Sequence, residues 1–75
     1  MRPAAKVLTV SDSVHAGHAE DKSGSALARV LDNAGFDVTE RRVVADGVEE
    51  VAAALRILAQ DFTGLVVTTG GTGFG

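Results

Sequence analysis

The residues best suited to chemistry in this chain form a glycine-rich segment, Thr69-Gly70-Gly71-Thr72-Gly73. Glycine has no Cβ and tolerates positive φ, so successive backbone N–H groups can point at one anion, and threonine hydroxyls add neutral hydrogen bonds. The segment is not a Walker loop, because no Lys-Ser or Lys-Thr pair follows the glycines. From the residues alone, a tight turn and a phosphate-binding loop both stay open.

Polar side chains also follow two other predicted strands. Ser11, Asp12 and Ser13 come directly after an apolar run, where they can contact a ligand or form the turn that ends the strand. Asp46 follows a second strand. An aspartate there can cap the next helix, bind Mg²⁺ or orient a substrate, and these roles do not exclude one another.

Two further groups stand between the first strand and the first helix. Asp21, Ser23 and Gly24 precede a helical pattern, so Asp21 or Ser23 is expected to cap that helix, and its start can also face an anion. His15 and His18 lie three residues apart without a cysteine or a third placed ligand, which favours solvated loop residues over a zinc site.

The hydrophobic period along the chain predicts the order βαβαβ. Strands are expected over 5–10, 36–44 and 65–69, a polar loop over 14–22, and helices up to 34 and over 48–60. Gly35 is expected to end the first helix in the left-handed conformation, and Asp46-Gly47-Val48-Glu49 to form a capping box. The predicted buried helix stripes are Ala26, Leu27, Val30, Leu31 and Ala34, and Val48, Val51, Ala52, Leu55, Leu58 and Ala59.

Strands that alternate with helices predict a parallel sheet with right-handed crossovers. The glycines follow the third strand instead of the first, which disfavours the dinucleotide-binding order and favours the order 2-1-3. Ligands of open α/β sheets bind outside the carboxyl ends of the strands, where the order reverses. This topology therefore directs residues 11–13, Asp46 and the segment 69–75 toward one site.

Composition excludes several other functions. The 75 residues, 45% hydrophobic and without cysteine, suit one globular domain. A net charge of −3, three phenylalanines and a single basic pair, Arg41-Arg42, argue against nucleic-acid binding, and this pair and Glu49-Glu50 are expected to face solvent. No apolar run approaches the roughly 20 residues of a membrane span, and no signal peptide is recognisable, so a cytoplasmic location is expected.

Several motifs together resemble the MogA/MoaB-like molybdopterin-binding family of molybdenum cofactor biosynthesis. They are VLTVSDS at 7–13, AG at 16–17, DKSG at 21–24, VAD at 44–46 and VVTTGGTG at 66–73. Each motif alone is weak, but their shared order and spacing make the match fairly specific. The resemblance covers nearly the whole chain after residue 4.

The resemblance implies a three-layer α/β/α domain, commonly a homotrimer, that binds molybdopterin. Some family members transfer AMP from MgATP to the molybdopterin phosphate, so Mg²⁺ and ATP are implied, with other cofactor-biosynthesis proteins as further candidate partners. By position, Asp46 matches a catalytic aspartate and candidate magnesium ligand. The implied substrate-binding residues are Ser11, Asp12, Ser13, Asp21, Ser23, Gly24, Thr69, Gly70, Gly71, Thr72 and Gly73.

One departure from the family pattern bears on activity. The family motif continues past the glycines into a Pro-Arg-Asp-like segment, and family domains are roughly twice this length. Residues 1–75 are therefore expected to be the N-terminal half of a single domain, with catalysis predicted for the complete domain. Two alternatives to the adenylyltransferase stay open, a non-catalytic pterin-binding or scaffold domain and a competence-damage-type domain that handles nucleotide pyrophosphates.

Overall fold

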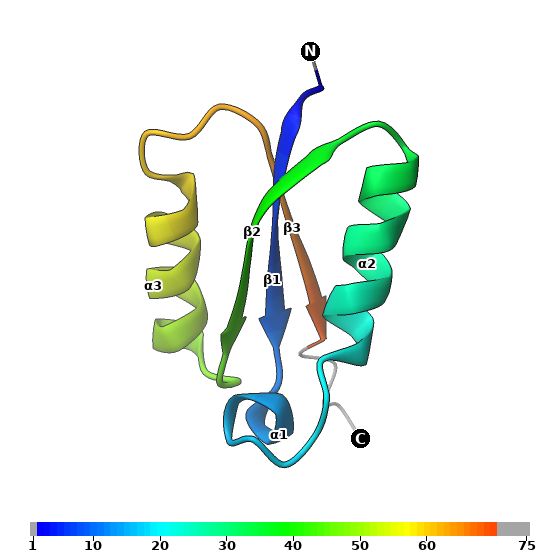
Figure 1. Ribbon diagram of the computed structural model, residues 1–75. Coiled ribbons are helices and arrows are strands. Elements are labelled where there is room, and N and C mark those ends of the chain that lie inside the picture. Colours follow the sequence, from blue (N-terminus) through cyan, green and yellow to red (C-terminus); the bar gives the residue numbers. More distant parts are fainter. Residues whose placement is uncertain (1, 71–75) are drawn as a thin grey trace.

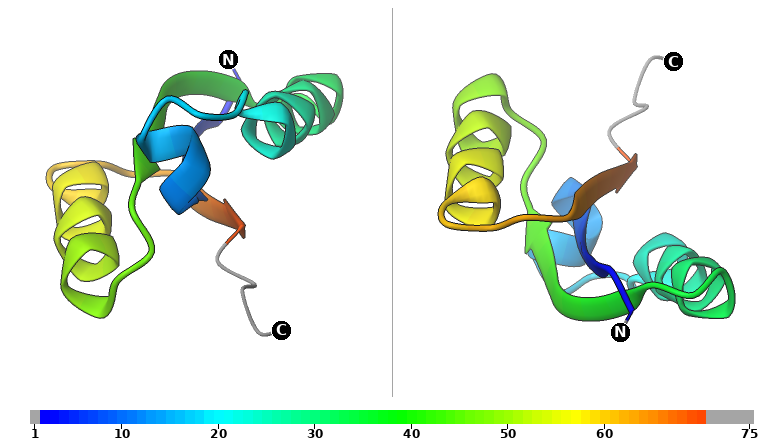
Figure 2. Two further views of the ribbon diagram at one scale, coloured as in Figure 1. Left: turned by 90° about the horizontal axis from the view of Figure 1, so that it is seen from below. Right: turned by 90° about the horizontal axis from the view of Figure 1, so that it is seen from above.

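The computed structural model describes residues 2–70 and shows a sheet with one long helix on each face (Figures 1 and 2). The elements are β1 (Ala4–Val10), α1 (Asp12–His15), α2 (Lys22–Asn33), β2 (Asp37–Val44), α3 (Val48–Ala59) and β3 (Leu65–Gly70). The three strands are parallel in the order β2-β1-β3. The predicted α/β/α layers, parallel sheet and strand order 2-1-3 are confirmed.

β1 carries most of the core because it is paired on both edges and covered on both faces. Leu8 and Val10 pack with Leu58 of α3, whereas Val7 packs with Leu31 of α2. All five of these side chains are buried. A strand whose residues are largely apolar on both faces is typical of a parallel strand between two helix layers.

β2 contains an irregularity that changes which face its residues occupy. Ala5 pairs with Val38 but Lys6 pairs with Glu40, so Thr39 is an extra residue on β2. A bulge of one residue reverses the alternation of the side chains after it. Val38 accordingly packs with the α2 side of the core and Val44 with the α3 side. This explains why apolar residues occur at both even and odd positions in 36–44.

The two ends of α2 match the sequence predictions. Asp21, and not Ser23, is the N-cap, and its side chain accepts a hydrogen bond from the Gly24 N–H at 3.0 Å. Gly35 follows the C-cap with φ of +97°, the left-handed conformation that glycine adopts most easily. Arg2 lies beside this end and donates to the carbonyl oxygen of Asp32 at 2.7 Å.

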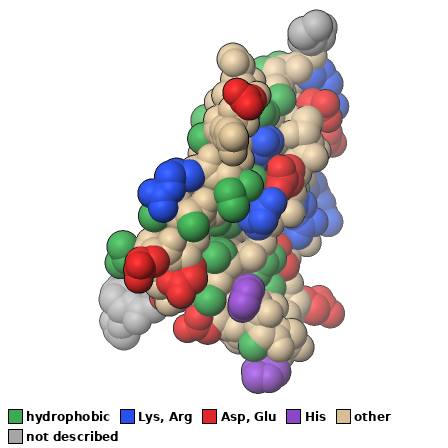
Figure 3. Space-filling model, turned by 90° about the vertical axis from the view of Figure 1, so that its left-hand side faces the viewer, with side chains coloured by type: hydrophobic (Ala, Val, Ile, Leu, Met, Phe, Trp, Pro, Cys, Tyr) green, Lys and Arg blue, Asp and Glu red, His purple; other side chains and the backbone are tan. Residues whose placement is uncertain are grey.

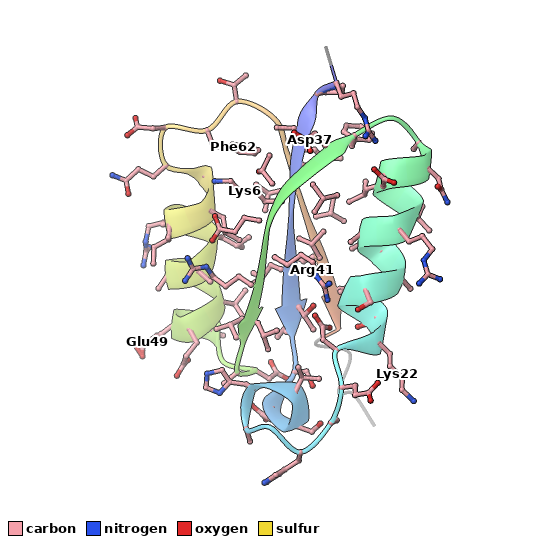
Figure 4. The ribbon with its side chains drawn as sticks, in the orientation of Figure 1. Lys6, Lys22, Asp37, Arg41, Glu49 and Phe62 are labelled. Atoms are coloured by element: carbon pink, nitrogen blue, oxygen red, sulfur yellow. The ribbon has the colours of Figure 1, made fainter. Side chains whose placement is uncertain are left out.

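The start of α3 differs from the prediction. Its N-cap is Gly47, with no side-chain cap hydrogen bond, so the predicted capping box with Asp46 as its acidic cap is wrong. Asp46 lies one residue too early, because the extended backbone of Gly47 already forms the boundary of the helix. At the other end, Lys6 donates to the Leu58 carbonyl at 2.9 Å and lies over the ring of Phe62 (Figure 4).

The buried stripes of the helices are narrower than predicted. Val30 is 62% exposed and Val48 is 88% exposed, so placing them in the core was wrong. α2 packs on the sheet through Leu27, Ala28 and Leu31. At about 100° per residue, Val30 lies about 60° beyond Leu27, outside that stripe. The predicted stripe residues Ala26, Ala34 and Ala59 are also exposed.

Within residues 2–70, none of the helices has both the length and the apolar character that crossing a membrane requires.

The packing predicts which apolar side chains stabilise the fold. Leu58 is fully buried in the core beneath α3, so Leu58→Ala is expected to lower the free energy of unfolding by about 3 kcal/mol. Val48→Ala, on the same helix but exposed, is the matched control and should change it by less than about 0.5 kcal/mol. Urea unfolding followed by circular dichroism measures both, and similar losses would contradict the assigned core.

Candidate functional site

The carboxyl ends of all three strands meet at one edge of the sheet, the lower edge in Figure 1. α1 lies across this edge, as the view from below in Figure 2 shows. The ends of β2 and β3 flank the end of β1 on opposite sides. The predicted convergence of the segments after the three strands is therefore confirmed as far as Gly70. Gly71, Thr72 and Gly73 lie outside the described residues.

Ser11 ends β1 and begins α1. Its N–H donates to the Val44 carbonyl at 2.9 Å, and its hydroxyl accepts from the Val14 N–H at 3.3 Å as the N-cap of α1. The predicted polar loop over 14–22 was wrong at its start, because α1 runs to His15. A helix of four residues is too short to give a hydrophobic period, so the sequence pattern did not indicate it.

Asp12 and Asp46 are brought together by a hydrogen bond across this edge. The Asp46 N–H donates to Oδ1 of Asp12 at 2.9 Å. Both residues are exposed, and Ser13 beside them is exposed too. The bond joins the segment after β1 to the segment after β2, so two of the three predicted site segments are in direct contact.

Asp21 occupies a second, more buried cluster on the α2 side. Its Oδ1 accepts from the Gly24 N–H at 3.0 Å, and its Oδ2 accepts from the Thr9 hydroxyl at 3.1 Å and from Arg41 at 3.0 Å. Arg41 also donates to the Ser25 hydroxyl at 3.1 Å. Figure 4 shows Arg41 between β2 and the start of α2. The cluster ties the first turn of α2 to β1 and β2.

The environment of Asp21 favours its charged form. Burial of the carboxyl raises its pKa, but the hydrogen bonds from Arg41, Thr9 and Gly24, with the charge of Arg41, outweigh burial and hold the pKa below its usual value. Asp21 is therefore ionised in the folded protein at neutral pH.

Sequence reasoning missed Thr9 and Arg41. Thr9 is 1% exposed and is a hydroxyl in an otherwise largely apolar strand, which was the available signal that it needs a buried partner. The prediction that Arg41-Arg42 faces solvent holds only in part, because Arg41 is exposed and Arg42 is half-buried. It did not include their partners: Arg41 binds Asp21, and Arg42 donates to Glu40 at 2.9 Å.

Two glycines in the predicted site are required by close approach. A Cβ on Gly24 would overlap the Asp21 carboxylate and the Thr9 hydroxyl. A Cβ on Gly70 would overlap the Val10 carbonyl, and its φ of +85° is also unfavourable for other residues. β3 therefore ends directly against β1. Thr69 pairs with Thr9 in the sheet, beside the cluster of Asp21.

The remaining predicted residues lie near these contacts. Ser23 is exposed in the first turn of α2. His15 and His18 are exposed, and both histidine side chains are visible at the surface of this end of the molecule in Figure 3. Within residues 2–70, no three His, Cys, Asp or Glu side chains gather as metal ligands would.

The chemistry of this edge fits a magnesium ion that is shared with a phosphate. Mg²⁺ keeps several waters and usually takes only one or two carboxylates besides substrate phosphates. Asp46 is exposed and forms no ion pair with another described residue, so its carboxylate can serve as one such ligand. Asp21 is unsuitable, because three donors already occupy its oxygens.

Fold and site together define an open α/β domain with polar side chains at the carboxyl edge of a parallel sheet. The chain belongs to the family described as a probable molybdopterin binding domain, whose model matches residues 6–75.

Curated relatives agree with this assignment. The chain is 37% identical over 73 residues to a molybdenum cofactor biosynthesis bifunctional protein of Chlorobaculum tepidum, covering 97% of this chain and 23% of that protein. It is 42% identical over 67 residues to a molybdopterin adenylyltransferase of Pyrococcus furiosus, covering 89% of this chain and 39% of that protein. The chain thus spans less than half the length of either relative.

Two solved structures share the fold. A putative molybdenum cofactor biosynthesis protein from Corynebacterium diphtheriae matches with a TM-score of 0.87 at 25% identity, over 100% of this chain and 49% of that one. The protein CinA of unknown function from Thermoplasma acidophilum matches with a TM-score of 0.84 at 29% identity, over 96% and 42%.

The tight contact at Gly24 gives a stability prediction. Alanine is ordinarily better than glycine inside a helix by about 1 kcal/mol. Gly24→Ala is nevertheless expected to destabilise the protein by about 1–3 kcal/mol, because its Cβ must displace Asp21 or Thr9. Ser23→Ala, exposed in the same turn, is the control with a change below about 0.5 kcal/mol. Urea unfolding compares them, and a Gly24→Ala protein as stable as wild type would contradict the close packing.

The lowered pKa of Asp21 gives a pH prediction. Asp21→Asn keeps an oxygen for the Gly24 N–H but removes the charge that Arg41 binds. A lowered folded pKa stabilises the protein fully above the ordinary value of 3.8 and progressively less as pH falls through the folded pKa. The stability difference between wild type and Asp21→Asn should therefore be largest at neutral pH and shrink below about pH 4. Urea unfolding from pH 3 to 7 measures it, and a difference that grows on acidification would contradict the ion pair.

Proposed function

We propose that this chain is the N-terminal part of a domain that binds molybdopterin and transfers AMP from MgATP to its phosphate. The observation that carries the proposal is the contact between Asp12 and Asp46 at the sheet edge where Gly70 ends β3. Family membership over residues 6–75 and the adenylyltransferase name of the Pyrococcus relative support it.

The proposed chemistry suits the residues at this edge. Nucleotidyl transfer depends mainly on holding phosphates in line and offsetting their charge, and it needs no protein nucleophile. In the proposal, the backbone N–H groups of 70–73 and the hydroxyl of Thr69 hold a phosphate. Ser11, Ser13 and the first turn of α2, with Ser23 and Gly24, line the rest of the site. Asp21 serves that turn indirectly by fixing its conformation.

Asp46 is the residue proposed to take part directly in the reaction through its carboxylate. When bound, Mg²⁺ would offset phosphate charge, and Asp46 would be its protein ligand or would orient the substrate. Asp46 does not cap α3. Among the described contacts, its carboxylate therefore has no structural role that would compete with binding Mg²⁺ or orienting the substrate. A homotrimer, a cytoplasmic location and interactions with other molybdenum-cofactor proteins belong to the same proposal.

A second candidate function follows from the likeness to CinA. That structure matches nearly the whole chain at a TM-score of 0.84, so the same edge could serve a domain that handles nucleotide pyrophosphates. The two functions differ in whether pterin or nucleotide alone is the cognate ligand. A domain that binds pterin without turnover is a third outcome of the same experiment.

The experiment is calorimetric titration of the full-length protein with molybdopterin, with and without MgATP, combined with an assay of AMP transfer. Asp46→Asn is expected to retain the fold, to bind molybdopterin and to lose at least about tenfold in transfer rate, since it loses the charge alone. Pterin binding without transfer would leave the scaffold function. Binding of nucleotide without pterin would favour the pyrophosphate-handling function and contradict the proposal.

A further inference from the structure

We propose that Asp12 is a positioning residue whose carboxylate holds the backbone of Asp46 in place. The inference rests on the proposed function for the role of Asp46, but its structural part can be tested separately. It assigns Asp12 a different task from direct contact with substrate or metal.

The segment that carries Asp46 has few anchors of its own. β2 ends at Val44 and α3 begins at Val48, so Asp46 belongs neither to the strand ladder nor to the helix. Within the described residues, its N–H is held by Oδ1 of Asp12 at 2.9 Å. Just before it, the Val44 carbonyl accepts from the Ser11 N–H at 2.9 Å. Two hydrogen bonds thus fasten this segment to the start of α1.

The hydrogen bonds of α1 hold the backbone of Asp12 in place. Ser11 caps the helix through its hydroxyl, and the Ser11 carbonyl accepts from the His15 N–H at 3.0 Å. The Asp12 carbonyl itself accepts from the Ala16 N–H at 2.9 Å. The backbone of Asp12 is therefore fixed by a closed helical turn.

This role needs an acceptor oxygen at position 12, and it does not need a negative charge. A ligand to Mg²⁺ would need the charge, because carboxylates are the side chains that the ion takes up. Asparagine keeps an oxygen at the same position and can orient it toward the Asp46 N–H. Alanine removes the oxygen. Asp12→Asn and Asp12→Ala therefore separate positioning from direct chemistry.

The first readout is the hydrogen exchange and chemical shift of the Asp46 amide, measured by NMR in the full-length protein without any ligand. In wild type and Asp12→Asn, the amide should show slowed hydrogen exchange and a hydrogen-bonded chemical shift. In Asp12→Ala, its exchange should be at least about tenfold faster, the factor expected from loss of one hydrogen bond to a side chain. His15→Ala, exposed on the same helix, should leave the Asp46 amide unchanged.

The second readout is AMP transfer by the same four proteins at saturating Mg²⁺ and ATP. Asp12→Asn should stay within about threefold of wild type in kcat, and Asp12→Ala should fall at least about tenfold. If Asp12→Asn loses transfer as completely as Asp12→Ala while its Asp46 amide stays protected, Asp12 acts through its charge and the proposal is overturned. An unchanged Asp46 amide in Asp12→Ala would overturn it as well. If the wild type shows no AMP transfer, the proposed function is contradicted. The exchange of the Asp46 amide still tests whether Asp12 holds the backbone of Asp46.

Discussion

The placement of β1 between two strands and two helices is the constraint on which the rest of the structure depends. Its burial on both faces favours apolar side chains, and the buried hydroxyl of Thr9 therefore needs a hydrogen-bond partner, which Asp21 provides. Its pairing on both edges brings the ends of β2 and β3 to either side of its own carboxyl end. The candidate site therefore exists because one strand is central, as parallel sheets with this strand order require.

The aspartates at this end of the sheet differ in how fully their oxygens are used. Asp21 accepts three hydrogen bonds, and the one from Arg41 is also an ion pair, so its charge stabilises the fold. Asp12 accepts one hydrogen bond from a backbone amide, and its role is to hold another segment. Asp46 offers an exposed carboxylate and is itself held by its N–H. Of these three carboxylates, that of Asp46 has the fewest contacts with the rest of the described fold.

The cap at Asp21 and the left-handed Gly35 could be predicted because local chemistry decides them, through cap preference and glycine conformation. The strand order 2-1-3 could be predicted from the position of the glycines after the third strand, together with the rule for ligand sites in open α/β sheets. The partners of Arg41, in contrast, depend on the bulge at Thr39 that turns it toward α2, and no sequence period reveals this bulge. The cap of α3 was misplaced by one residue because the extended backbone of Gly47, which no side-chain preference indicates, forms the boundary of the helix.

We propose that molybdopterin binds at the carboxyl edge of the sheet. Mapping of backbone amide chemical shifts during titration with molybdopterin tests this binding site most directly, because the amides of all segments are observed in one experiment. Perturbations confined to residues 11–13, 21–24, 46 and 69–73 are predicted. Perturbations centred on the opposite end, around Arg2, Lys6 and Phe62, would contradict the account.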